Sequence, residues 1–180
     1  VCSSDLCIDS NDFDYVLEDI ERCLSYLGIE LFNGTKSIYW SGFYCQGDGA
    51  SFEGRYTYNQ LNVMHCAAMV DDREFLQFAI DLEKLTRRVP ELAFDVKRDT
   101  SKRYYHEQTM GAFLHEDVAE GLLDPEYLNV TAAITDIVRA VARWCYKRLE
   151  EENDYITSDE NIIETIEINE YEFDEDGRIA

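Results

Sequence analysis

The stretch DPEYLNVTAAITDIVRAVARWCYKRLEEE, residues 124–152, decides the fold class of this 180-residue chain. It opens with Asp124, a residue type that caps helices well, and Pro125, which suits the first helical position. The apolar residues after them recur at three- and four-residue steps: Leu128, Ile134, Ile137, Val138, Val141, Trp144, Cys145 and Leu149. This spacing predicts one long helix that packs its apolar face on the rest of the protein and ends near Glu152.

Two helices are predicted before this one. Residues 12–27 repeat the three- and four-residue apolar spacing, and Gly28 is placed to end that helix. Asp71 or Asp72 caps a second helix, and Pro90 follows its end. The long helix therefore has helical neighbours to pack against.

One further helix is predicted after it. Thr157 and Glu160 match a capping box and open a helix over residues 158–169, with three isoleucines on one side. The tail from about residue 170 has few apolar residues: Tyr171, Phe173 and Ile179. This tail is either held by those anchors or loosely packed.

Strand signals lie between the helices. Residues 37–44 and 51–58 are rich in aromatic and β-branched residues, and positions 46–49 between them suit a tight turn. Apolar residues alternate over 92–96, and residues 104–110 can return as the partner strand. We therefore predict a single-domain α+β fold over residues 1–180, with a small antiparallel sheet of about four strands, in two hairpins, packed against several helices.

The net charge of −22 is the most unusual bulk property. Residues 150–180 hold thirteen acidic residues and one arginine, and residues 1–34 hold eight acidic residues and one arginine. A field of this sign repels nucleic acid and attracts basic partners. We expect no direct nucleic-acid binding and a protein partner with a basic surface, although the acidity can also serve solubility alone.

The cysteines and the apolar segments indicate a location. The six cysteines form no CxxC pair, which favours reduced, buried thiols, with a labile bridge between Cys2 and Cys7 left open. No apolar run reaches the roughly 20 residues of a membrane-spanning helix, and the first residues lack a secretion-signal layout. We expect an intracellular protein with no membrane association.

The turn between the first two strands is also a candidate binding site. Gln46, Gly47, Asp48 and Gly49 accept positive φ, which explains them as a hairpin turn. The alternative is a binding loop over Gln46 to Ser51, in which the free amides cradle an anion or Asp48 acts as a base or ligand. Because Gly-Asp-Gly matches neither a phosphate loop nor a dinucleotide fingerprint, the structural interpretation is preferred.

His106 beside Glu107 is the best candidate for acid–base or metal chemistry. On a strand these neighbours point to opposite faces, so they are not expected to converge. No catalytic signature places His65, His106 or His115. We therefore predict no enzyme activity, no metal and no cofactor.

Three segments carry a family resemblance: YWSGFYCQGDGASFEG (39–54), YYHEQTM (104–110) and YITSDENIIETIEINEYEFDEDGRIA (155–180). They resemble a family of small, functionally uncharacterised bacteriophage and prophage proteins with an SGFxxQGDGASF motif and a TSDE…NEYEF…DGR segment. Some of these proteins are labelled antitoxin-like. The first motif is carried here by Ser41, Gly42, Phe43, Gln46, Gly47, Asp48, Gly49, Ala50, Ser51 and Phe52. The resemblance implies a phage origin and a location in the host cytoplasm. It does not imply a particular reaction.

Three functional hypotheses remain. The first is a non-enzymatic phage protein that inhibits a host factor, such as a defence effector, through an acidic face that mimics nucleic acid. That face is expected on the 158–169 helix: Asp159, Glu160, Glu164 and Glu167. The second is an antitoxin-like protein that neutralises a basic toxin. The third is an enzyme or small-ligand sensor that uses the loop at 46–51 with His106. The sequence does not decide between a monomer and a homodimer.

Overall fold

The structure, a computed structural model, describes residues 10–43 and 47–174. The helices are η1 (Ser10–Phe13), α1 (Asp14–Leu27), α2 (Asn62–Met69), α3 (Arg73–Arg88), η2 (Glu107–Thr109), α4 (Glu116–Ala119), α5 (Asp124–Ile156) and α6 (Asp159–Ile168). The strands are β1 (Ile29–Thr35), β2 (Ile38–Ser41), β3 (Gly49–Phe52), β4 (Gly54–Thr57), β5 (Ala93–Arg98) and β6 (Met110–Leu114). The predicted α+β class and its long helix in the C-terminal half are confirmed.

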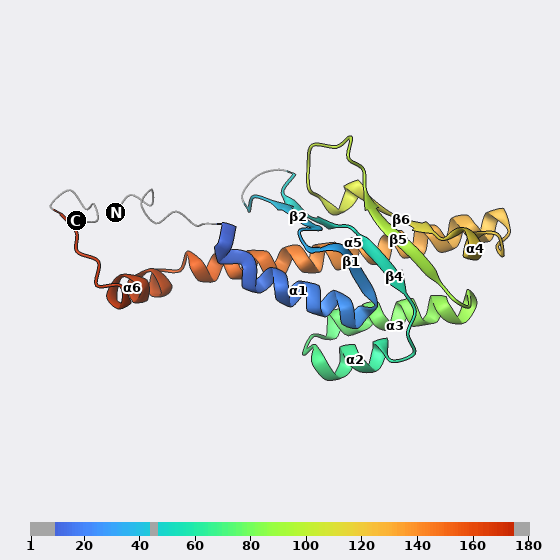
Figure 1. Ribbon diagram of the computed structural model, residues 1–180, viewed down its shortest axis with the longest axis horizontal. Helices are drawn as coiled ribbons and strands as arrows, with labels where there is room; N and C mark the ends of the chain where they lie inside the picture. The colour runs from blue at the N-terminus through green and yellow to red at the C-terminus, as the bar shows by residue number, and fades with distance from the viewer. Residues whose placement is uncertain (1–9, 44–46, 175–180) are drawn as a thin grey trace.

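The strands form two antiparallel sheets, one of four strands in the order β1-β4-β5-β6 and one of β2 and β3. One face of the larger sheet turns its apolar side chains toward α1, α3 and α5, and these form a single core. Figure 1 shows α5 running the length of the molecule behind the sheet, with α4 near one end and α6 beyond the other. The α5 helix contacts α1, α3, α6, η2, β3 and β6.

The first hairpin is confirmed as β2 and β3, but the predicted strand 51–58 is two strands. It breaks at Glu53, and β4 leaves the hairpin to lie between β1 and β5. Gly54 permits this change of sheet, because a Cβ at that position would lie 2.7 Å from the carbonyl oxygen of Glu30. Only glycine lets the two backbones come this close.

The predicted partner strand of the second hairpin is wrong. We expected residues 104–110, whereas the strand that pairs with β5 is β6, which begins at Met110. The Thr109 amide and hydroxyl both donate to the His106 carbonyl, at 2.8 Å and 2.7 Å, and close a tight turn there. Such local side-chain-to-backbone bonds compete with strand pairing.

Two predicted helix starts differ in their capping residue. Asp124 lies inside the first turn of α5, preceded by Leu123, rather than capping it. In α6 the cap is Ser158, which accepts a hydrogen bond from the Asn161 amide at 3.2 Å. Thr157, the expected cap, instead bonds back to the Asn153 carbonyl. Within the described residues, no helix is both long and apolar enough to cross a bilayer.

The described cysteines are the buried, free thiols that the sequence predicts: Cys23, Cys66 and Cys145. Burial raises the pKa of Cys23 and of Cys66 to about 11, so neither is a reactive thiolate at neutral pH. The other three cysteines, Cys2, Cys7 and Cys45, lie outside the described residues, and the Cys2–Cys7 bridge stays a prediction.

Candidate functional site

We call residues 46–51 the motif loop; they complete the connection from β2 to β3 and include the first residues of β3. Its first predicted site residue, Gln46, lies outside the described residues. Gly47 has φ +100°, as a turn glycine should, and a Cβ there would meet the Tyr104 ring at 3.2 Å. Gly49 does not have a positive φ, so the prediction that the turn conformation requires a glycine there is wrong. A Cβ at Gly49 would lie 3.1 Å from Cδ2 of His106, and its role is close packing.

The structure therefore brings His106 to the motif loop, although 57 residues separate it from Gly49 in the sequence. Its Nδ1 lies 2.8 Å from Oε2 of Glu107. The expectation that these two side chains diverge is wrong, because the segment is a turn into η2 and not a strand. Glu107 is buried, and Nη1 of Arg143 lies 3.6 Å from its Oε1. The same Nδ1 accepts a hydrogen bond from the Gln108 amide at 3.2 Å, so His106 caps η2 while it lies against Glu107.

The other predicted loop residues, Asp48 and Ser51, have structural roles. The Asp48 carboxylate lies over Gly42, where any Cβ would collide with it. The Tyr146 hydroxyl donates to the Gly42 carbonyl at 3.2 Å, and burial, with the nearby charges of Glu150 and Asp48, raises the pKa of Tyr146 to about 12. Ser51 is fully buried, which closes it to a substrate, and among the described residues its hydroxyl has no hydrogen-bond partner.

An aromatic and charged cluster fastens the 99–109 loop to the hairpin beside this site. The Arg98 guanidinium lies 4.8 Å from the Tyr39 ring centre and 5.1 Å from that of Tyr105. Glu53 accepts hydrogen bonds from the Tyr39 hydroxyl and from the Arg98 amide, each at 3.1 Å. These contacts hold the loop rigidly, which explains the packing of His106 on Gly49 without a ligand.

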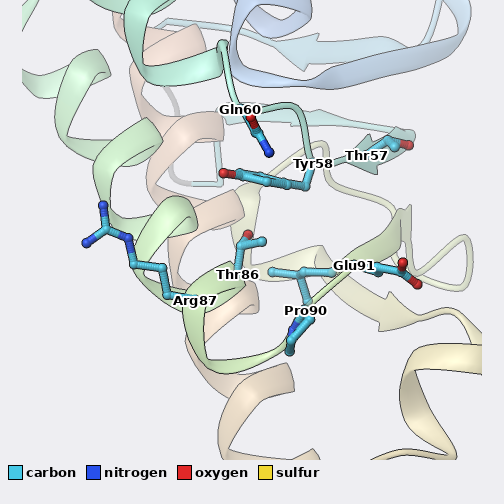
Figure 2. A pocket seen from close by; sticks show the side chains of 8 residues that line it. Thr57, Tyr58, Gln60, Thr86, Arg87, Pro90 and Glu91 are labelled. Atoms are coloured by element: carbon cyan, nitrogen blue, oxygen red, sulfur yellow. The ribbon is translucent and has the colours of Figure 1, made fainter.

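Two shallow hollows, of about 520 and 720 Å³, flank residues 57–60. Figure 2 shows the first, where Tyr58 reaches toward α3, which carries Thr86 and Arg87. Arg87 is already paired with Glu83 at 3.2 Å. The motif loop and His106 line neither hollow. Among the described residues no three His, Cys, Asp or Glu side chains gather as metal ligands.

The second candidate region is the acidic end, which we define as residues 12–22 and 147–174. Here η1 and the first half of α1 lie beside the end of α5, with α6 beyond them (Figure 1). An ion pair links α5 to α1 here: Nη2 of Arg148 lies 3.8 Å from Oδ2 of Asp19. The acidic end holds sixteen acidic and three basic residues. The described acidic residues of the two ends thus lie in one place.

All four predicted carboxylates of α6 are exposed there: Asp159, Glu160, Glu164 and Glu167. The helix buries none of its own side chains. Ile163 is 55% exposed and Ile168 71% exposed, although α6 is capped and regular. The described part of the chain therefore covers the apolar side of α6 only in part, at Ile162 and Ile166. The sequence indicated the amphipathic pattern but not that both sides stay open.

Residues 13–159 match the model of a protein family, Domain of unknown function (DUF8835). The chain belongs to the DUF8835 family. The match covers the core, the motif loop and His106, and it ends at the first residue of α6. A comparison with curated proteins gives no match, and a comparison with solved structures gives none either. The DUF8835 match thus assigns a family without a function, and α6 lies beyond it.

Proposed function

We propose that this protein is a non-enzymatic binding protein whose acidic end docks on a basic surface of a protein partner. In the fuller form of the proposal it is a phage protein, and the partner is a host factor that it inhibits by occupying a cleft made for nucleic acid. One observation carries the proposal: α6 is a capped helix that leaves its carboxylates and two of its isoleucines, Ile163 and Ile168, exposed.

Helix energetics explain why this observation points to a partner. A helix of ten residues is marginal in water by itself, and most helices are stabilised by burying an apolar side. Since the described residues leave the apolar side of α6 only partly covered, a partner groove is the natural place for it. Helix-in-groove recognition uses this kind of element.

The charge of the acidic end selects the partner. Carboxylates at its surface repel nucleic acid and steer a basic protein toward it. Each exposed ion pair contributes only about 0.2–1 kcal/mol, so recognition depends on many charges together. A basic toxin offers the same chemistry as a nucleic-acid-binding defence factor, and the identity of the captured partner separates these two outcomes.

The test is capture from lysate of a bacterial host by the immobilised protein at low and high salt. We compare the wild type with the α6 quadruple variant, in which Asp159, Glu160, Glu164 and Glu167 are each changed to Lys. The matched control changes to Lys four exposed acids at the opposite end, in or next to α4 and at the start of α5: Glu116, Asp117, Glu120 and Asp124.

We expect the wild type and the control to capture the same basic protein, with capture weakening as salt rises. The α6 quadruple variant should bind it more slowly and more weakly. If that variant stays folded and binds with unchanged rate and salt dependence, the acidity of α6 serves only solubility. Recognition then lies elsewhere, and the proposal fails.

A second candidate function, an enzyme or small-ligand sensor at the motif loop, is favoured by the His106–Glu107 pair at 2.8 Å. Its test is a thermal-shift screen of nucleotides and common metabolites against the wild type and His106→Gln. A compound that stabilises only the wild type supports this function. Equal responses from both proteins to every compound count against it.

A further inference from the structure

The helix α2 lies in a stretch of the sequence that has no charged residues. Residues 59–70, NQLNVMHCAAMV, contain no Asp, Glu, Lys or Arg, in a chain of which 30% is charged. Only Asn62 and Cys66 of α2 are buried. Figure 1 shows α2 at the periphery of the molecule, below α1 and beside α3.

The outward side of α2 is apolar. Met64 is 57% exposed and Met69 61% exposed, and Leu61, Ala67 and Ala68 are also exposed. Leu61, Met64 and Ala68 follow each other at three- and four-residue steps, so they form one stripe along the helix. Exposed apolar stripes of this kind mark interaction surfaces.

We infer that this stripe is a self-association surface, through which α2 of one copy packs antiparallel on α2 of a second copy. Charge is the first argument. Two copies that each carry −22 repel one another across most approaches, whereas residues 59–70 themselves add no charge to a contact between the copies. The basic partner proposed above is matched to the acidic end and leaves α2 free.

Shape is the second argument. A two-fold axis places the same patch of both copies in contact, so the patch must be complementary to itself. With the axis near Cys66, Met64 of each copy faces Ala68 of the other. A long flexible side chain then lies against a small one twice, which methionine accommodates well. The stripe thus meets the geometric requirement of a symmetric helix pair.

The experiment measures the oligomeric state by sedimentation and light scattering over a wide range of protein and salt concentrations. We expect a dimer that strengthens as salt rises, because salt screens the repulsion between the two copies. Binding of a basic partner at the acidic end weakens under the same change. Failure of one proposal is therefore distinguishable from failure of the other.

Substitutions test whether the two copies touch through α2. Met64→Glu should shift the population to monomer, and so should Ala68→Glu. Leu128→Glu, an equally exposed apolar position on α5, should leave the dimer intact. The double variant Met64→Glu/Ala68→Lys sets opposite charges across the contact twice and should restore pairing. A protein that is monomeric at all concentrations and salts overturns the inference, and so does a dimer that Met64→Glu leaves unchanged.

Discussion

At the scale of single residues, two glycines of the larger sheet, Gly54 and Gly111, differ in what a side chain would meet there. A Cβ at Gly54 would lie 2.7 Å from the Glu30 carbonyl oxygen, whereas nothing lies within 4 Å of a Cβ at Gly111. We predict that Gly54→Ala lowers the free energy of unfolding by about 1–3 kcal/mol, since β1 cannot retreat from its neighbour. Gly111→Ala should be neutral or slightly stabilising. Denaturant unfolding checks both, and equal effects would contradict the packing argument.

The motif loop gives a second prediction at this scale. Gly47→Val forces a β-branched residue to φ +100° and against Tyr104, so it should lower the melting temperature clearly. Asp48→Asn should be mild, because asparagine tolerates the same turn. An Asp48→Asn variant that keeps its melting temperature but loses partner binding would show that the loop holds a ligand or partner directly.

At the scale of elements, one carboxylate joins two helices. Oδ1 of Asp72 accepts from the amides of Glu74, at 2.8 Å, and Phe75, at 3.1 Å, and so caps α3 as predicted. Its Oδ2 accepts from the Trp144 indole of α5 at 2.7 Å. Asp72→Ala should cost about 2 kcal/mol, half from the cap and half from the indole bond. The exposed neighbour Asp71 is the control, and Asp71→Ala should change little.

The same carboxylate predicts a pH dependence. Burial alone would raise the pKa of Asp72, but the bonds from Trp144 and the two amides outweigh it and lower the pKa below its usual 3.8. A lowered folded-state pKa stabilises the fold above the unfolded value, and this stabilisation is lost as pH falls through the folded value. The stability difference between wild type and Asp72→Ala should therefore be full at neutral pH and shrink in acid. A difference that grows below pH 3.8 would contradict this assignment.

The sequence predicted those helices and strands that have a clear local signal. The α1, α3 and α5 helices were predictable because each repeats apolar residues along one face. α2 was missed because its exposed side is as apolar as its buried side, so no periodic contrast marks it. β6 was misplaced because Tyr104–Thr109 has strand-like composition, while hydrogen bonds at His106 and Thr109 close a turn.

At the scale of the whole molecule, the candidate site was predicted only in its parts. Composition identified two acidic ends and the α6 carboxylates. That they meet follows from α1 lying along α5, which is a tertiary contact without a local signal. The packing of Gly49 on His106 likewise joins residues that are distant in sequence, and no spacing rule predicts it.

The meeting of the acidic ends gives the last prediction. Sixteen acidic and three basic residues at one end repel each other in the folded state, and unfolding separates them. Salt reduces the Debye length to about 10 Å at 0.1 M, so it should raise the melting temperature of the wild type.

The α6 quadruple variant and its control test whether clustering or net charge causes this repulsion. Each set of four reversals changes the net charge from −22 to −14, because every reversal adds two charges. Thermal unfolding from low to high salt should show a smaller rise in the α6 variant, since its repulsion is relieved where the acids are crowded. The control removes the same charge from the opposite end and should keep most of the wild-type response. Equal losses in both variants would mean that total charge governs the salt response, and that the acidic end is no more strained than the rest of the surface.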